Sequence, residues 1–186
     1  MNRLYEALRL MQRSHAGQKR KDGRPYWTHP LAVYDVLSIE LRVRDDDAKI
    51  AALLHDVVED TPVQLAEIET RFGAMVAQMV GALTKPPLAP GQTKEEMLES
   101  YYAGLRSAPD VVRQIKIADR VHNLRDMVST DRSFQEKYLP DSRELLAVLA
   151  QTPGIELLYA EYAAAESRLL HLLTGREFRR RAYSPQ

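Results

Sequence analysis

The sequence of 186 residues contains no cysteine, which excludes a disulfide framework and a thiolate metal site. Any bound metal must therefore have nitrogen and oxygen ligands. No apolar stretch approaches the roughly 18 residues of a membrane span, and the amino terminus is amphipathic rather than signal-like. We therefore expect a soluble, cytoplasmic protein that has no membrane partner.

The sequence also lacks an excess of charge of either sign, because Lys plus Arg and Asp plus Glu each number 26. No overall field would attract nucleic acid, so we expect no nucleic-acid partner. Two local basic clusters stand out, at residues 19–24 and 176–181. The first suits a small anionic ligand, and the second is typical of a solvated tail. The sequence gives no signal for an oligomeric state.

Glycine and β-branched residues are sparse, and no stretch alternates with the period of two that a strand requires. Apolar residues instead recur at spacings of three and four, which is the pattern of an amphipathic helix. The chain is long enough for one compact domain. We therefore predict an all-α fold, a single helical bundle of about nine or ten helices over residues 1–175, followed by a basic tail at 176–186.

Proline, glycine and capping residues give approximate helix limits. A loop with a lysine, glycine and proline-rich composition occupies residues 17–28, and three prolines exclude regular helix between residues 84 and 91. The predicted helices are 2–16, 29–41, 45–59, 64–71, 74–83, 93–107, 109–129, 140–150 and 154–173.

The neighbouring His55 and Asp56 lie in an apolar, helix-compatible segment. Burying ionisable side chains without partners costs several kcal/mol, and a bound cation removes most of that penalty. The segment is therefore predicted to supply half of a metal site.

Two carboxylates, Glu59 and Asp60, follow His55 and Asp56 by four residues each, so on a helix they share a face about one turn away. That position suits a group that orients or deprotonates a water molecule at the metal rather than one that binds the metal. Like charges so close also raise one pKa, which suits acid–base work near neutrality. Acidic residues are unfavourable at a helix C-terminus, so a functional reason is favoured.

Two further segments bear candidate ligands. Asp119, His122 and Asn123 fall at i, i+3 and i+4 on one helix face, and the basic loop 17–28 leads directly into His29. Convergence of three helices would join His29, His55, Asp56 and Asp119. Two imidazoles and two carboxylates suit Mn²⁺, Fe²⁺ or another divalent ion that keeps open positions. His122 is expected to support the site rather than to bind metal.

The order of these segments resembles the hydrolase domain of the RelA/SpoT superfamily of HD-domain phosphohydrolases. Residues 15–30 match His-x-Gly-Gln-x-Arg-Lys…Pro-Tyr-x-x-His-Pro, residues 51–61 match Ala-Ala-Leu-Leu-His-Asp-x-x-Glu-Asp-Thr, and residues 116–125 match Lys-x-Ala-Asp-Arg-x-His-Asn-x-Arg. The likeness extends from about residue 3 to about residue 175. It implies a stand-alone small alarmone hydrolase that uses Mn²⁺ to remove the 3′-diphosphate of guanosine tetra- and pentaphosphate (ppGpp and pppGpp), giving GDP or GTP and pyrophosphate.

The resemblance also implies a role for each matching position. The four predicted metal ligands keep that role, and Glu59 and Asp60 match the catalytic acidic pair. Arg20 matches a residue that packs on guanine, Lys21 a phosphate or base contact, and Asn123 a nucleotide contact.

Alternatives remain at this point. A hydrolase of adenosine-type alarmones or another HD-domain nucleotide phosphohydrolase fits the same pattern, although the loop with Arg20 and Lys21 argues against a deoxynucleotide monophosphatase. A non-catalytic nucleotide sensor could dispense with Glu59 and Asp60, which are present. Residues 84–93 depart from the family pattern, so closure over the substrate is in question there.

Overall fold

The computed structural model describes residues 2–182, with side chains as far as Thr174. Within this range the regular elements are helices, accompanied by one isolated bridge between Lys19 and Pro25. The elements are α1 (Arg3–Ser14), α2 (Thr28–Asp35), the π-helical η1 (Val36–Glu40), α3 (Asp46–Leu54), α4 (Val57–Asp60), α5 (Leu65–Phe72), α6 (Ala74–Leu83), α7 (Lys94–Ser107), α8 (Asp110–Asp126), the 3₁₀ turn η2 (Met127–Ser129), α9 (Arg132–Leu149) and α10 (Ile155–Ala182). The all-α prediction is confirmed.

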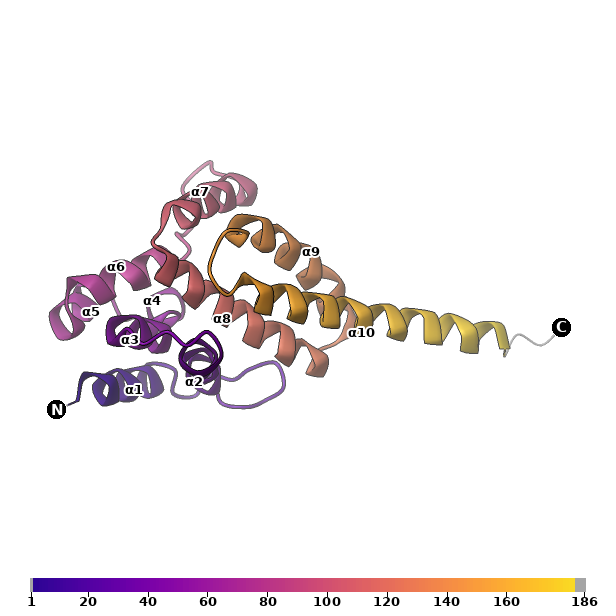
Figure 1. The fold of residues 1–186 in the computed structure, drawn as a ribbon, viewed down its shortest axis with the longest axis horizontal. Helices are drawn as coiled ribbons and strands as arrows, with labels where there is room; N and C mark the ends of the chain where they lie inside the picture. The colour runs from indigo at the N-terminus through magenta and orange to yellow at the C-terminus, as the bar shows by residue number, and fades with distance from the viewer. Residues whose placement is uncertain (1, 183–186) are drawn as a thin grey trace.

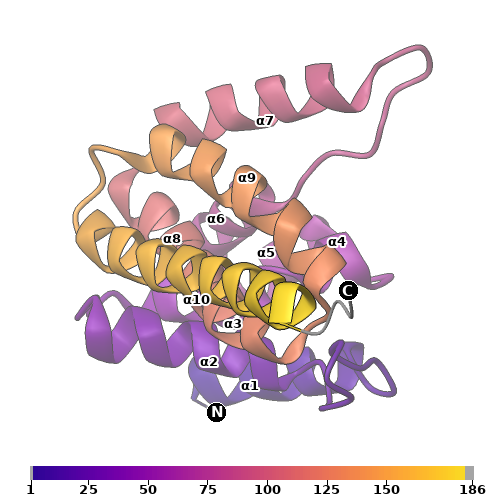
Figure 2. The same ribbon diagram turned by 90° about the vertical axis from the view of Figure 1, so that its right-hand side faces the viewer.

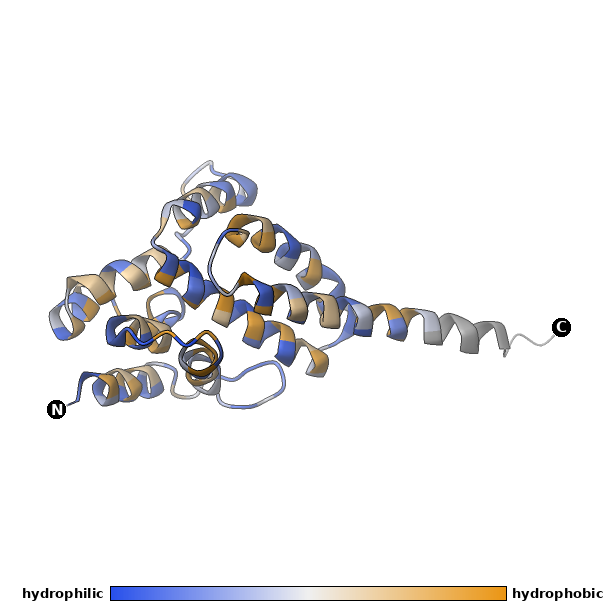
Figure 3. Cartoon of the chain, in the orientation of Figure 1, coloured by the Kyte–Doolittle hydropathy of each residue, from blue (hydrophilic) through white to orange (hydrophobic). Residues whose placement is uncertain are grey.

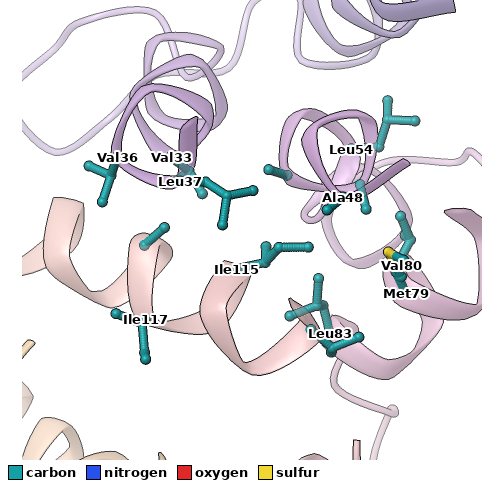
Figure 4. Packing of buried hydrophobic residues seen from close by; sticks show 14 of the residues in the cluster. Val33, Val36, Leu37, Ala48, Leu54, Met79, Val80, Leu83, Ile115 and Ile117 are labelled. Atoms are coloured by element: carbon teal, nitrogen blue, oxygen red, sulfur yellow. The ribbon is translucent and has the colours of Figure 1, made fainter. Parts of the chain in front are cut away.

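Helix α8 crosses the middle of the molecule and contacts α2, α3, α6, α7, α9 and α10 (Figures 1 and 2). Its buried Ile115 lies between Leu37 of η1 and Leu83 of α6 (Figure 4). Helices α1, α2 and α3 lie on one side of α8, and the far end of α10 extends beyond the other helices (Figure 1). Residues 115–122 in the middle of α8 are buried, so a polar group on this part of the helix is surrounded by protein.

Capping side chains explain where several helices begin. Asp45 accepts hydrogen bonds from the amides of Asp47 and Ala48 at the start of α3, and Thr93 forms a reciprocal capping box with Glu96 at the start of α7. Gly73 separates α5 from α6 with a φ of 91°, a conformation that glycine adopts without a steric penalty. Hydrophilic residues occupy much of α7, whereas α6 is mostly apolar (Figure 3).

The predicted continuous helix over residues 45–59 is wrong. It is interrupted at His55 and Asp56, where Asp56 has φ −99° and ψ −7°. In an unbroken helix two adjacent side chains point about 100° apart. The interruption lets both side chains turn toward the same point, which the apolar periodicity of the segment did not reveal.

The predicted start of a helix at residue 140 is also wrong. Helix α9 begins at Arg132, after the side chain of Asp131 caps it, and includes Pro140 in its interior. A proline inside a helix removes one helical hydrogen bond, and α9 nevertheless continues through Pro140. At the other end, the backbone of α10 is helical to Ala182, through much of the predicted tail 176–186. The side chains of this tail and its last residues, 183–186, lie outside the described residues, so the boundary at 175 stays a prediction.

None of the helices in the described part of the chain is both long and apolar enough to cross a bilayer.

Candidate metal centre

The four predicted metal ligands come together from three parts of the chain. His29 belongs to the first turn of α2, His55 and Asp56 form the turn between α3 and α4, and Asp119 lies on α8. His29 Nε2 is 3.2 Å from Asp119 Oδ1 and 3.5 Å from Asp56 Oδ2. His55 Nε2 is 3.0 Å from Asp56 Oδ2 and 3.9 Å from Asp119 Oδ1. The four donor atoms therefore surround one point.

The hydrogen bonding of His55 fits a metal ligand. Its Nδ1 lies 2.8 Å from the carbonyl oxygen of Ala52, so Nδ1 holds a proton, and in the neutral imidazole the lone pair is on Nε2. Within residues 2–182, the fully buried Nε2 has no hydrogen-bond partner of acceptable geometry. Such an unsatisfied buried atom costs free energy unless a ligand engages it. Donor atoms of His29, His55 and Asp119 also lie within 4.8 Å of one another, so the cluster fits a divalent metal site.

His29 is oriented by a second imidazole. Its Nδ1 lies 2.8 Å from Nδ1 of His122 on α8. Burial lowers the pKa of His29, and burial together with the neighbouring His29 lowers the pKa of His122 to about 4. His122 is therefore neutral at pH 7, and with a metal at Nε2 of His29 the Nδ1–H of His29 donates to His122. This geometry agrees with the supporting role that the sequence suggested for His122.

Asp119 is held at both carboxylate oxygens by its own helix. Buried Lys116 donates to Oδ2 at 2.8 Å, and the side-chain amide of Asn123 donates to Oδ1 at 2.6 Å. Burial opposes the charged form of Asp119, but Lys116 and the nearby histidines outweigh it and keep its pKa well below the usual range. A carboxylate that stays charged and cannot rotate is a suitable ligand for a hard cation.

Burial and neighbouring charges also oppose each other in setting the pKa values of His55 and Asp56. Burial disfavours the charge on His55, yet the adjacent Asp56 and then Asp119 raise the pKa of His55 to about 9. Burial would raise the pKa of Asp56, but His55 and then His29 lower it. A proton on His55 therefore balances the charge of the same carboxylates that a bound cation would balance.

The predicted acidic pair is divided between two environments. Asp60 lies 2.9 Å from the hydroxyl of Tyr26, which is also 2.7 Å from Oδ2 of Asp56. Burial and the charge of Asp56 raise the pKa of Asp60. Glu59 instead accepts hydrogen bonds from the backbone amide and the ammonium of Lys85, each at 3.0 Å. Only Asp60 is joined to the metal ligands by a hydrogen-bonded side chain.

Tyr26 was missed by the sequence reasoning. Its hydroxyl contacts Asp56 and Asp60, and its ring lies 4.7 Å from the ring of His15. His15 is fully buried and bonds Gln18 at 2.7 Å, and Gln18 donates to the backbone oxygen of Asp60 at 2.9 Å. The available signal was the position of Tyr26 three residues before His29, which places both side chains on one side of the entry to α2.

The predicted substrate residues border a cavity of about 200 Å³ beside the cluster. Arg20 donates to Oδ1 of Asn123 at 2.9 Å and to Asp126 at 3.0 Å. The ammonium of Lys21 lies 3.1 Å from the centre of the Phe134 ring. The cavity thus combines cations with aromatic surface, which suits a phosphorylated base. It is lined by Lys19, Arg20, Lys21, Asp22, Tyr26, Asn123, Asp126, Met127, Ser129, Thr130, Phe134 and Tyr138.

An all-α fold in which two histidines and two aspartates surround one point defines a helical domain with a candidate divalent-metal site. The chain belongs to the HD domain family, whose model matches residues 7–156.

Relatives within this family have names that concern guanosine polyphosphates. The chain is 34% identical over 161 residues to the guanosine-3′,5′-bis(diphosphate) 3′-pyrophosphohydrolase of Haemophilus influenzae, covering 85% of this chain and 24% of the relative. It is 37% identical over 160 residues to a GTP pyrophosphokinase of Streptomyces coelicolor, covering 85% of this chain and 18% of the relative. The chain therefore spans a quarter or less of the length of these curated relatives.

A solved structure has a similar fold over most of both chains. It is described as a metazoan ortholog of SpoT that hydrolyzes ppGpp and plays a role in starvation responses. The two structures agree with a TM-score of 0.77 at 26% identity, covering 90% of this chain and 96% of the solved one.

Proposed function

We propose that this protein is a metal-dependent phosphohydrolase that removes the 3′-diphosphate of ppGpp or pppGpp and releases GDP or GTP with pyrophosphate. The observation that most directly supports this is the convergence of His29, His55, Asp56 and Asp119 beside a cavity lined by Arg20 and Lys21. The names of the curated relatives and of the solved structure support the choice of substrate. A cytoplasmic location stays a prediction of the sequence.

The proposed cofactor is Mn²⁺, held by His29, His55, Asp56 and Asp119. Two imidazoles and two carboxylates suit a six-coordinate divalent ion with open positions better than a four-coordinate zinc site. When bound, the ion supplies Lewis-acid activation of water and of a phosphate oxygen. His122 and Lys116 keep two of the ligands, His29 and Asp119, oriented toward it.

The acidic pair is proposed to manage the proton of the attacking water. Water adds to the phosphorus that is attached to the 3′ oxygen, the P–O bond to that oxygen breaks, and the departing 3′ oxygen takes up a proton from solvent to become a hydroxyl. Asp60 accepts the proton from the water, because its carboxylate is next to Asp56 and its pKa is raised by burial and by the charge of Asp56. Glu59, fixed by Lys85, orients the water from the side of loop 84–93.

Arg20 and Lys21 are proposed to hold the nucleotide. The planar guanidinium of Arg20 suits stacking on a base, and Lys21 suits contact with phosphate. Because Arg20 also bonds Asn123, and Asn123 bonds Asp119, base binding is linked to the metal ligand through two hydrogen bonds. Asn123 is proposed to exchange its bond with Arg20 for a ribose or phosphate oxygen of the substrate.

A nucleotide panel tests the activity. The purified protein is incubated with Mn²⁺ and ppGpp, pppGpp, an adenosine 3′-diphosphate analogue or a deoxynucleoside monophosphate, and pyrophosphate and orthophosphate are measured separately. Pyrophosphate from ppGpp is the expected product. Pyrophosphate released only from the adenosine compound would show that the substrate is an adenosine nucleotide rather than a guanosine nucleotide. Orthophosphate released from monophosphates would show that the protein catalyses a different reaction, the hydrolysis of nucleoside monophosphates.

Variants of the acidic pair test the assigned roles. Asp60→Asn is expected to keep its affinity for Mn²⁺ but to lower kcat about 10²- to 10⁴-fold, the usual contribution of a positioned proton acceptor. Glu59→Gln is also expected to lower kcat. The exposed Asp141→Asn on α9 serves as a matched carboxylate-to-amide control with unchanged kcat. Full activity in the double variant of Glu59 and Asp60 would refute their role.

A further inference from the structure

A tyrosine hydroxyl joins the metal centre to the acidic pair. We infer that Tyr26 is a positioning residue that fixes the carboxylates of Asp56 and Asp60 relative to each other. Its hydroxyl lies 2.7 Å from Oδ2 of Asp56 and 2.9 Å from Oδ2 of Asp60, so one proton is shared between two acceptors. Its effect on metal affinity is independent of the substrate, whereas its effect on rate rests on the proposed function.

The oxygen of Asp56 that Tyr26 contacts is the one that faces the histidines. Oδ2 lies 3.0 Å from His55 Nε2 and 3.5 Å from His29 Nε2. A carboxylate oxygen has lone pairs for two partners. A hydrogen bond from Tyr26 occupies one of them and sets the rotation of the carboxylate, so that the other is directed toward the shared centre. Asp119 receives comparable support from Lys116 and Asn123, and Tyr26 is the corresponding donor for Asp56.

The second acceptor, Asp60, is held from two directions by the same loop. Tyr26 contacts its side chain, and Gln18 donates to its backbone oxygen at 2.9 Å. Two carboxylates this close repel each other, and a donor between them offsets the repulsion. Tyr26 therefore keeps Asp60 within reach of the cluster although the turn at His55 and Asp56 interrupts the helix before it.

The ring of Tyr26 is fixed independently of its hydroxyl. It lies 4.7 Å from the ring of buried His15 and borders the cavity that contains Arg20. Removing only the hydroxyl therefore leaves the packing of loop 17–28 in place. This separation makes Tyr26→Phe a test of positioning rather than of folding.

Mn²⁺ titration by calorimetry provides a readout without substrate. Tyr26→Phe is expected to weaken Mn²⁺ binding by about 10-fold or more, the range found for groups that orient metal ligands. Tyr162→Phe is the matched control, because it removes a hydroxyl that contacts Glu166 at 3.2 Å within α10, a helix that supplies none of the four predicted metal ligands. Unchanged Mn²⁺ affinity in Tyr26→Phe, with the same fold by circular dichroism, would overturn the inference.

Kinetics at saturating Mn²⁺ then separate positioning from substrate binding. Tyr26→Phe is expected to lower kcat at least about 10-fold while KM for ppGpp changes less than about 3-fold. In a double-mutant cycle with Asp60→Asn the two losses should not multiply, because Tyr26 acts through Asp60. Fully multiplicative losses, or a change confined to KM, would contradict the link. If the wild-type protein hydrolyses no ppGpp, the proposed function fails while the Mn²⁺ comparison still decides the role of Tyr26.

Discussion

At the scale of single residues, the contact between His29 and His122 makes a specific prediction. His122→Ala removes the acceptor for Nδ1–H of His29, which lies 2.8 Å away in a buried site. A metal-binding histidine whose second nitrogen loses its partner binds metal about 10- to 100-fold more weakly. We expect that loss for Mn²⁺ in His122→Ala, measured by calorimetry at pH 7.

An asparagine at this position provides the graded comparison. Its side-chain oxygen can still accept from His29, so His122→Asn should lose less affinity than His122→Ala. The exposed His171→Ala on α10 is the control for loss of an imidazole elsewhere. Wild-type Mn²⁺ affinity in His122→Ala would show that His29 does not depend on this contact.

Residue types and their spacing were sufficient to predict that His29, His55, Asp56 and Asp119 come together, and their role as metal ligands stays a prediction. His55 and Asp56 are too polar for the apolar helix that contains them, and a cation is the simplest partner for such groups. Tyr26 and Lys116 were not predicted, because a tyrosine or lysine near a loop or on a helix gives no sign of its partner in sequence. Their roles depend on which carboxylate lies within hydrogen-bond distance, which only the packed structure specifies.

At the scale of elements, the presence of most helices could be predicted from the sequence. The turn at His55 and Asp56 and the course of α9 through Pro140 could not. Spacings of three and four apolar residues identified helices, but the turn at His55 and Asp56 follows from a tertiary demand, since both side chains must face His29 and Asp119. Proline at 140 suggested a boundary by local rules. Helix α9 continues through it because Leu139, Leu145 and Leu149 are buried in the core on both sides of the proline.

Three elements meet at one arginine outside the metal centre. Arg125 of α8 donates to both oxygens of Glu40 in η1, at 2.6 and 2.8 Å, and to Glu161 of α10 at 2.8 Å. The side chain is partly exposed, so the network contributes only about 1 kcal/mol. Arg125→Met is expected to lower Tm by about 2 to 4 °C at pH 7 in a protein of this size, measured by calorimetry.

The pH dependence of this difference gives a second check. Hydrogen bonds from Arg125 lower the pKa of Glu40 in the folded protein below its ordinary value of 4.5. The stabilisation is therefore complete above pH 4.5 and is lost as the pH falls through the lowered pKa. The Tm difference between wild type and Arg125→Met should shrink in that acid range. The control Arg132→Met breaks an exposed pair within α9 and should change Tm less. A difference independent of pH would exclude Glu40 as the partner responsible.

At the scale of the whole molecule, the metal centre lies where the amino-terminal helices meet α8. His29 of α2 and Asp119 of α8 are separated by 90 positions in the chain, and the turn that bears His55 and Asp56 follows α3. These elements also contribute Val33, Ala48, Leu54 and Ile115 to one core (Figure 4). Local opening that separates α2 or α3 from α8 would therefore disperse the ligands.

Binding of Mn²⁺ should consequently stabilise the entire domain. A ligand that binds only the folded state stabilises it by about 2.7 kcal/mol at 100 times its Kd, which corresponds to a rise in Tm of about 5 to 11 °C for a chain of this length. Differential scanning calorimetry with and without Mn²⁺ measures the shift, and a chelator should reverse it. His55→Ala removes a predicted ligand whose buried Nε2 faces Asp56 and Asp119, and it should abolish the shift. His171→Ala should retain it. An equal shift in His55→Ala would place the stabilising Mn²⁺ outside this cluster, and the convergence of the three motifs would then have another cause.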